Sequence, residues 1–253
     1  MSVPLPRPIK QTIKRVLWSA KGIFILEDYL KFKKSARREG RGLEASLDTL
    51  CPVLFDKTAG TNFDRHYVYH VSWAVRRVKE ISPAKHIDIG STLYFAGTLS
   101  AFIPVDFYDY RPADIQLSGL HSLRGDLLHL PFKDGEVASL SCLHTIEHVG
   151  LGRYGDPIDA NGDLKAIKEL CRVTAHGGNL LVVVPTGKAM RIEFNAHRVY
   201  AFEQFVSCFE GFKLKQFSYI PERAERGGLI EHASPTDIAN DVHGCGCYWF
   251  TKE

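Results

Sequence analysis

The chain has 253 residues, a length that fits one medium-sized core with an appendage. Charged residues make up 24% and hydrophobic residues 45%, which excludes a wholly disordered or fibrous protein. Basic charge is concentrated at one end. Residues 1–42 contain eleven Lys or Arg and three acidic residues, so they carry +8 and the remaining 211 residues carry −5. An acidic body gives no support for a nucleic-acid groove, and we expect no nucleic-acid partner.

Residues 1–42 are expected to form a basic, amphipathic helical extension. Within residues 9–38, apolar side chains recur at near-helical spacing among lysines: Ile13, Val16, Leu17, Ile23, Leu26, Tyr29 and Leu30. Two interpretations stay open. The helix packs on the body with its basic face in water, or it contacts an anionic membrane face or a partner protein.

The sequence predicts a cytoplasmic protein. No stretch approaches the roughly 18 apolar residues of a membrane span. The six cysteines have no CxxC spacing, and five of them lie in or beside apolar segments, which favours buried free thiols in a reducing compartment. The inner face of the membrane, reached through residues 9–38, is the alternative location.

Residues 43–253 are expected to form one α/β domain. Asp64 is the expected N-cap of a helix that runs to about Ile81. After Pro83, short apolar runs alternate with helical segments, and the runs read KHIDIG, FIPVDFYDY, VASLSCLH, NLLVVVPT, KLKQFSYI and CYWFTK. This alternation favours a mostly parallel sheet with helices on both faces. The last two runs lack a helix between them and are expected to pair antiparallel at the sheet edge.

Acidic and glycine residues follow three of the expected strands, where a parallel sheet binds its ligands. In HIDIGSTL, Asp88 is followed by Gly90 and Ser91. The glycine lets the backbone approach a ligand, and the carboxylate can accept hydrogen bonds. Asp109 comes about twenty residues later, the spacing at which an acidic residue binds ribose hydroxyls. Asp126, in RGDLLHLPF, is the third acidic candidate.

From about Tyr67 to the C-terminus the chain resembles the class I S-adenosylmethionine-dependent methyltransferases. The resemblance rests on HIDIGS, Asp109, GDLLHLPFKDGEVASLSCLHTIEHV and IKELCRVTAHGGNLLVVVP. It implies a Rossmann-like, seven-stranded, mostly parallel sheet with an antiparallel last strand, helices on both faces, and S-adenosylmethionine as the cofactor. The segments HTIEHVGLGRYGDPIDANGDLKAIKEL and FNAHRVY further resemble a poorly characterised bacterial family found among surface-polysaccharide genes.

This resemblance assigns roles to the cofactor candidates. Thr92 departs from the pattern, because many relatives have a second glycine there. By this resemblance, Asp88, Gly90 and Ser91 would contact the methionine moiety of the cofactor, and Asp109 would contact the ribose. Asp126, with the Leu127 amide, would contact the adenine, and His144 would lie at the reacting end.

The HxxEH segment His144, Glu147 and His148 is the catalytic candidate, because it follows the strand beside which the methyl acceptor would lie. A neutral histidine can take the proton of a sugar hydroxyl, and a metal can lower the pKa of that hydroxyl. The spacing resembles the ExxEH ligand set of the small-RNA terminal 2′-O-methyltransferases, with His197 as a fourth ligand. A metal-free His or Glu base, a divalent metal on these four residues and a structural role stay open.

Residues near the same rim are the acceptor candidates, and the plain alternatives are a connecting loop and core packing. The residues are Arg153, Tyr154 and Asp156 in GLGRYGDPID, Asn195 and His197 in FNAHRVY, and Tyr67, which recurs at helical spacing with His70 and Trp73. Cys245, Cys247 and Trp249 alternate on the last strand and are expected to face one way and pack, without a zinc site.

The expected function is an O-methyltransferase acting on a sugar hydroxyl of a bacterial surface glycan or its precursor. Two alternatives stay open: a non-catalytic, nucleoside-binding scaffold of a glycan-assembly complex, and a methyltransferase for another small molecule. The acidic body disfavours RNA as the acceptor.

Overall fold

The computed structural model describes residues 20–40 and 45–253. The chain divides into two compact units, Met1–Asn62 and Phe63–Glu253. The α/β domain was expected to begin at residue 43. Between residue 45 and Asn62 the structure contains only the one-turn helix η1 (Leu47–Thr49).

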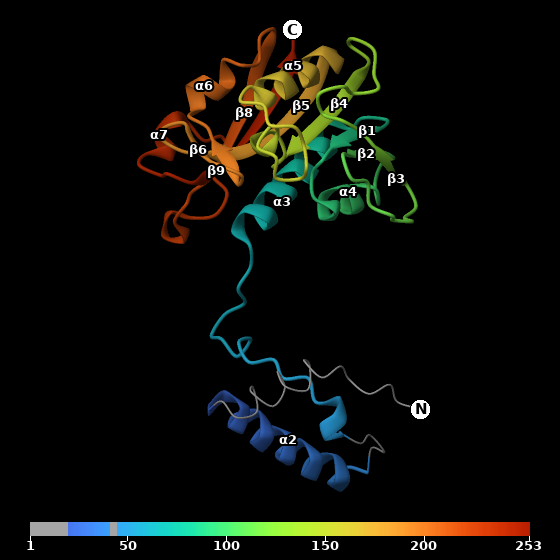
Figure 1. The fold of residues 1–253 in the computed structure, drawn as a ribbon, viewed down its shortest axis with the longest axis vertical. Helices are drawn as coiled ribbons and strands as arrows, with labels where there is room; N and C mark the ends of the chain where they lie inside the picture. Colours follow the sequence, from blue (N-terminus) through green and yellow to red (C-terminus); the bar gives the residue numbers. More distant parts are fainter. Residues whose placement is uncertain (1–19, 41–44) are drawn as a thin grey trace. The chain divides into compact units, whose positions relative to one another are not determined.

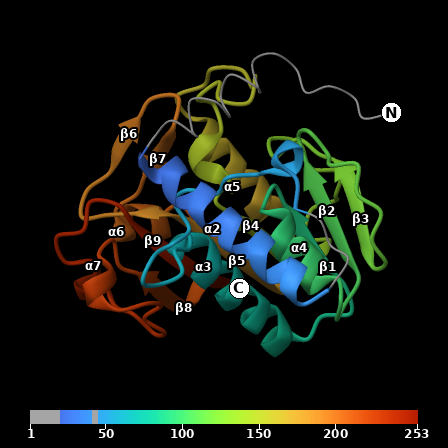
Figure 2. The same cartoon turned by 90° about the horizontal axis from the view of Figure 1, so that it is seen from below.

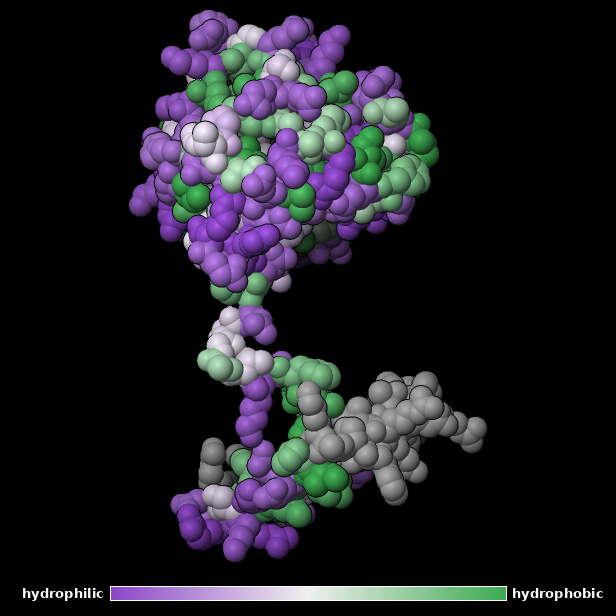
Figure 3. Space-filling model, turned by 90° about the vertical axis from the view of Figure 1, so that its left-hand side faces the viewer, coloured by the Kyte–Doolittle hydropathy of each residue, from purple (hydrophilic) through white to green (hydrophobic). Residues whose placement is uncertain are grey.

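The first unit contains the helix α2 (Ala20–Arg38), which lies inside the predicted extension. The part of that prediction on residues 9–19 falls outside the described residues. An ion pair of 2.6 Å joins Lys31 to Glu27 one turn earlier, and the Tyr29 hydroxyl donates to the Ala45 carbonyl at 3.0 Å. Green, apolar surface is visible on this unit in Figure 3. The exposed apolar side chains of α2 are Ile23, Phe24, Leu26, Leu30 and Phe32. Across the described part of the chain, no helix has the length and apolar character needed to span a bilayer.

The second unit begins with the helix α3 (Arg65–Ile81), as predicted. Asp64 caps it, because its side chain accepts a hydrogen bond from the Tyr67 amide at 3.2 Å. The helix ends where Ser82 adopts a left-handed conformation at φ 51°. Its buried residues include His70 and Trp73, one turn apart, so these two belong to the core face. Tyr67 is 44% exposed.

A seven-stranded sheet with the order β3-β2-β1-β4-β5-β9-β8 forms the centre of this unit (Figures 1 and 2). β1 to β5 are parallel, and β9 is antiparallel to both β5 and β8. The strands are β1 (His86–Ile89), β2 (Val105–Asp109), β3 (Leu120–Arg124), β4 (Val137–Leu143), β5 (Thr174–Thr186), β8 (Phe212–Ile220) and β9 (Gly244–Lys252). The predicted Rossmann-like sheet with an antiparallel last strand is confirmed.

Helices cover both faces of the sheet. α3 and α4 (Leu93–Leu99) pack on one face, and α5 (Gly162–Val173) and α6 (Phe202–Val206) pack on the other. Each face of the sheet has its own hydrophobic cluster, one packed against α3 and the other against α5. β5 is almost continuously apolar because its side chains alternate between the two, with Leu181 in the α3 cluster and Leu180 in the α5 cluster. The predicted packing of the last strand is confirmed, since Cys245, Cys247 and Trp249 all lie in the α3 cluster.

Shorter elements follow the carboxyl ends of the central strands. The 3-10 turn η2 (Ile146–His148) follows β4, and a hairpin of β6 (Arg191–Glu193) and β7 (His197–Val199) follows β5. The remaining elements are η3 (Ala224–Arg226) and α7 (Pro235–Ile238). The buried Arg198 ties η2 and β7 together. Its guanidinium donates to the Val149 carbonyl at 2.7 Å and lies 3.5 Å from the Asp163 carboxylate of α5.

Candidate functional site

Two cavities of about 440 Å³ each lie at the carboxyl edge of the sheet. Gly90, His144, His148 and Tyr154 line both cavities. The strand-end cavity is further lined by residues that include Tyr108, Asp109, Arg111, Asp126, Leu127 and Asp156. The histidine cavity is further lined by residues that include His66, Tyr67, Ser91, Glu147, Arg153, His197 and His243. One wall with two imidazoles therefore separates two ligand-sized spaces.

The strand-end cavity holds two of the predicted carboxylates, and each is oriented by its own loop. Oδ1 of Asp109 accepts a hydrogen bond from the Arg111 amide at 2.7 Å, and Oδ1 of Asp126 accepts one from the Leu128 amide at 2.9 Å. Leu127 lies beside Asp126 in the same wall, as predicted. These two carboxylates project from the ends of β2 and β3, so neighbouring parallel strands bring them to one cavity.

Gly90, in the loop that leaves β1, lies against Thr145 in the loop that leaves β4. It has φ 65°, and a Cβ atom there would lie 2.7 Å from Cγ2 of Thr145. The Thr145 hydroxyl donates to the Gly90 carbonyl at 2.9 Å, which holds the two loops together. A larger residue would separate the loops and deform the wall that both cavities share.

Asp88 does not lie where the sequence analysis placed it. It is fully buried under the first turn and lines neither cavity. It accepts hydrogen bonds from the Ser91 hydroxyl at 2.6 Å and the Ser141 hydroxyl at 2.5 Å. Burial raises the pKa of Asp88 to about 7, although these two hydroxyls oppose the shift. The reason is strand geometry: β1 is central and all four of its residues are buried, so Asp88 supports the turn from beneath. Ser91 lines the histidine cavity and not the strand-end cavity.

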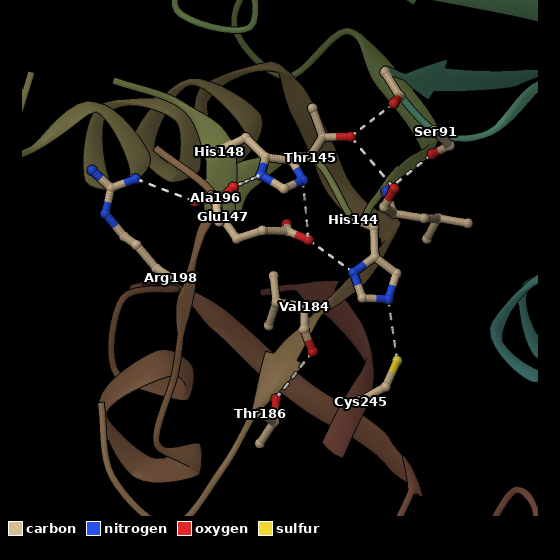
Figure 4. A network of polar contacts seen from close by, with 12 residues as sticks. Ser91, His144, Thr145, Glu147, His148, Val184, Thr186, Ala196, Arg198 and Cys245 are labelled. Carbon is tan, nitrogen blue, oxygen red and sulfur yellow. Dashed lines mark hydrogen bonds and ion pairs between the residues drawn. The ribbon is translucent and has the colours of Figure 1, made fainter. Parts of the chain in front are cut away.

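The HxxEH residues converge on one atom, as their spacing predicted. Oε1 of Glu147 lies 2.8 Å from Nδ1 of His144 and 3.8 Å from Nε2 of His148 (Figure 4). The turn η2 brings Glu147 and His148 to the same side, and His144, at φ 56°, turns its ring back toward them. The Glu147 side chain is 1% exposed and its Oε2 has no hydrogen-bond partner in the described structure.

The two histidines of this wall have opposite protonation preferences. Burial disfavours the charged ring of His144, but Cys245 and the Glu147 carboxylate outweigh burial and raise its pKa. Burial lowers the pKa of His148, so this ring is neutral at pH 7. Nδ1 of His148 lies 2.6 Å from the Ala196 carbonyl, which can only accept, so the proton sits on Nδ1 and the lone pair on Nε2.

His66 and His243 complete the histidine cavity, and the sequence analysis missed both. The His66 ring stacks on the His144 ring at a centroid distance of 6.1 Å and on the His243 ring at 6.0 Å. Burial lowers the pKa of His66 to about 4, with His144 and His243 adding to the effect. Their only sequence signals were a histidine one residue before Tyr67 and a histidine two residues before Cys245.

The predicted acceptor residues separate into two groups. Arg153, His197 and Tyr67 line the histidine cavity, and Tyr154 lines both cavities. Asp156 lines the strand-end cavity, and both Asp156 and Asn195 hold loops. Asp156 accepts from the amides of Gly150 at 2.8 Å and Tyr154 at 3.1 Å, and Nδ2 of Asn195 donates to the Leu151 carbonyl at 3.3 Å. Asn195 lines neither cavity. Both side chains bond to the backbone of the loop of residues 150–156, Asp156 from within that loop and Asn195 from the β6–β7 hairpin.

The structure does not assemble His144, Glu147, His148 and His197 as one metal site. Nε2 of His144 lies 3.4 Å from the Cys245 sulfur, and Nε2 of His197 lies 3.2 Å from Oε2 of Glu193. Within the described residues, two other groups place their donor atoms within 4.8 Å of one another: His66 with His144 and Cys245, and Glu193 with His197 and His243.

Comparisons with known proteins agree with this architecture. The model of a family described as "Caenorhabditis protein of unknown function, DUF268" matches residues 135–227. No curated protein matches the chain. The solved N-methyltransferase NodS from Bradyrhizobium japonicum WM9, in complex with S-adenosyl-L-homocysteine, is 16% identical, with 74% of this chain and 86% of that chain covered and a TM-score of 0.50. A putative sarcosine dimethylglycine methyltransferase from Galdieria sulphuraria is 14% identical, with 74% and 86% covered and a TM-score of 0.51.

These likenesses show the fold of the class I S-adenosylmethionine-dependent methyltransferases. The matched family model ends before His243 and begins before His144, so it includes the β4–η2–α5 segment and the hairpin. The expected resemblance to a bacterial polysaccharide family stays a prediction.

Proposed function

We propose that this chain is an S-adenosylmethionine-dependent O-methyltransferase that acts on a sugar hydroxyl of a bacterial surface glycan or its precursor. One observation carries the proposal: the strand-end cavity and the histidine cavity share the wall of His144 and His148. A ligand in the first cavity and an acceptor in the second can therefore meet at this wall, which is the geometry that a transfer reaction needs.

The strand-end cavity fits the cofactor in its chemistry. Its volume suits a nucleoside-sized ligand, the Asp109 carboxylate can accept hydrogen bonds from ribose hydroxyls, and Asp126 with the Leu127 amide can bind the adenine edge. Because Gly90 has no side chain, a ligand can approach the backbone closely there. When bound, S-adenosylmethionine supplies an electrophilic methyl group.

His148 is the proposed base, because its ring is neutral and its lone pair is on Nε2. Transfer forms an O–CH3 bond on the acceptor as the S–CH3 bond breaks, and the hydroxyl proton passes to Nε2 of His148. The Glu147 carboxylate, 3.8 Å away, stabilises the imidazolium that results. The Ala196 carbonyl keeps the ring in the tautomer that this step requires.

A polyhydroxylated acceptor suits the lining of the histidine cavity. Arg153 can donate to ring or hydroxyl oxygens, and the aromatic ring of Tyr67 offers a face to a sugar. The lining also contains Asp64, whose side chain caps α3. The choice of a bacterial surface glycan rests on the sequence resemblance of the HTIEHVGLGRYGDPIDANGDLKAIKEL segment.

The experiment has two arms on the full chain. Calorimetry with S-adenosylmethionine should give one site, and incubation with a panel of nucleotide sugars and glycan fragments should yield a product heavier by one methyl group in place of a hydrogen. The matched control is His148→Ala, which should bind the cofactor and produce nothing. Cofactor binding with no turnover on any hydroxyl acceptor would favour the nucleoside-binding scaffold, and absence of cofactor binding would exclude both.

For the partner of the extension, we infer an anionic membrane surface. α2 ends in a basic last turn with Arg37 and Arg38, and it exposes Phe24 and Phe32. The chain should sediment with phosphatidylserine vesicles and not with phosphatidylcholine vesicles, and Phe24→Glu with Phe32→Glu should abolish sedimentation. Equal sedimentation of wild type and variant would contradict this docking.

A further inference from the structure

A second cluster of possible ligand side chains lies on the rim of the histidine cavity, outside the proposed base. Glu193 and His197 face each other across the β6–β7 hairpin as a register pair, and His243 comes from the loop before β9. Their donor atoms lie within 4.8 Å of one another. Three potential ligands from two segments about fifty residues apart in the chain therefore lie close together.

The geometry of the two imidazoles suits a shared ion. The rings of His197 and His243 are 4.8 Å apart between centroids and nearly perpendicular, at 85°. Two imidazoles bound to one zinc ion at about 2.0–2.1 Å place their ring centres about 5 Å apart. Nε2 of His197 is buried and has no hydrogen-bond partner in the described structure, although it lies 3.2 Å from Oε2 of Glu193. The imidazole nitrogen and the carboxylate oxygen thus lie close together without a hydrogen bond between them.

Arg191 holds the carboxylate in the orientation that a metal needs. Its Nε and Nη2 donate to Oε1 of Glu193 at 2.9 and 2.7 Å, which leaves Oε2 toward the imidazoles. Nη1 of the same guanidinium donates to the Val242 carbonyl, beside His243. This arginine therefore ties the hairpin to the third ligand, in the manner of the outer contacts that orient metal ligands.

The competing group, His66 with His144 and Cys245, is less suited to an ion. The rings of His66 and His144 are almost parallel, at 4°, with centroids 6.1 Å apart. Imidazole lone pairs lie in the ring plane, so the lone pairs of two stacked rings do not converge on one point. Nε2 of His144 is already in contact with the Cys245 sulfur at 3.4 Å.

We propose that Glu193, His197 and His243 bind one divalent transition-metal ion, with Arg191 as the positioning residue. Two imidazoles and one carboxylate form a three-ligand set of the kind that zinc and other first-row metals take, with coordination positions left open. His197 and His243 line the histidine cavity, so an open position faces the acceptor. There, resting on the proposed function, the ion coordinates an oxygen of the acceptor and fixes which hydroxyl reaches His148.

The test measures Zn²⁺ and Mn²⁺ binding to the full chain after EDTA treatment and removal of the chelator. The wild type should bind one ion. Glu193→Gln and His243→Ala should each weaken binding at least about tenfold, and the control His176→Ala, which removes an exposed imidazole elsewhere, should bind like the wild type. Saturating Zn²⁺ should raise the unfolding temperature of the wild type and of His176→Ala, and this increase should be lost in the other two variants. Circular dichroism without metal checks that all variants fold.

Each contrary result has a definite meaning. Lack of binding by the wild type, or equal binding by Glu193→Gln and His243→Ala, would overturn the proposal. Loss of binding in Cys245→Ser with retention in Glu193→Gln would place the ion in the competing group and also overturn it. Zn²⁺ binding that follows the predicted variants in a chain that fails to bind S-adenosylmethionine would keep the metal site and remove the proposed function.

Discussion

The two cavities that meet at His148 are built in different ways. The strand-end cavity takes its carboxylates from the ends of adjacent strands, and backbone amides orient Asp109 and Asp126. The histidine cavity takes its imidazoles from the start of α3, the turn η2, the β6–β7 hairpin and the loop before β9. The carboxylates proposed for binding are therefore positioned by the order of the strands in the sheet. The imidazoles proposed for the reaction lie instead on loops and element ends, whose conformations the strand order does not determine.

The cavities also differ in charge. The strand-end cavity contributes carboxylates that can accept hydrogen bonds, and the histidine cavity contributes several imidazoles whose pKa burial lowers, with His144 as the exception. Burial lowers the pKa of His66 to about 4 and lowers the pKa values of His148 and His197 as well. Neutral imidazoles can accept a proton or bind a metal, and both uses are lost when the rings are protonated.

The largest effect should come from the residue that separates the cavities. His148→Ala should lower methyl transfer at least about 100-fold, because general-base catalysis contributes about 10²–10⁴-fold. S-adenosylmethionine affinity should stay within about threefold, since the ring acts on the acceptor's proton. Turnover and calorimetry on the same preparation check this, with His176→Ala as the control. A variant that loses cofactor binding as strongly as activity would show that the wall serves the strand-end cavity alone.

Substitutions confined to the strand-end cavity should instead weaken cofactor binding. Asp109→Ala and Asp126→Ala should each weaken S-adenosylmethionine binding by about 1–3 kcal/mol, because polar groups of the ligand lose their partners. Calorimetry measures the loss, and Glu210→Ala, an exposed carboxylate elsewhere, is the control. Unchanged affinity in both variants would mean that the cofactor does not use these strand ends.

The same contrast explains what could be predicted from sequence. The alternation of apolar runs predicted the sheet and its antiparallel edge, and HxxEH predicted that Glu147 and His148 would meet His144, because these are local patterns. The strand β3 was missed, since only Leu120 of its five residues is buried and its sequence lacks an apolar run. His243 was missed because it approaches His197 only through the packing of the hairpin, which no local pattern records.

The pH dependence of the reaction should report the histidine cavity. The base must be neutral, and burial lowers the pKa of His148 from 6.5, so the midpoint of the fall in rate should lie below pH 6.5, with a slope of up to about tenfold per pH unit. Measuring kcat/KM from pH 5 to 8 locates this fall. A decline with its midpoint above pH 6.5 would assign the base to a group other than a buried neutral histidine.

The smallest expected effect concerns His86 in β1, beneath both cavities. It should appear as a change in the free energy of unfolding with pH. His86 is fully buried between the hydroxyls of Ser139 and Ser141, and burial lowers its pKa to about 3. Between about pH 3 and pH 6.5 the unfolded chain binds more protons at His86 than the native chain does. The stability from the neutral ring is therefore complete above pH 6.5 and is lost as the pH falls, by about 1 kcal/mol between pH 6.5 and pH 5.5.

Asp88 opposes this loss, because its raised pKa lets the native carboxyl keep a proton that the unfolded chain releases above about pH 4. Protonation at Asp88 thus favours the native state as the pH falls through about 7. Between pH 6.5 and pH 5.5 the two contributions are each about 1 kcal/mol and opposite in sign, so they nearly cancel in the wild type. Urea unfolding at the two pH values should therefore show a gain in stability on acidification in His86→Gln and a loss in Asp88→Asn, each relative to the wild type. If the pH dependence is the same in all three proteins, the two groups do not titrate as a buried pair beneath the first turn.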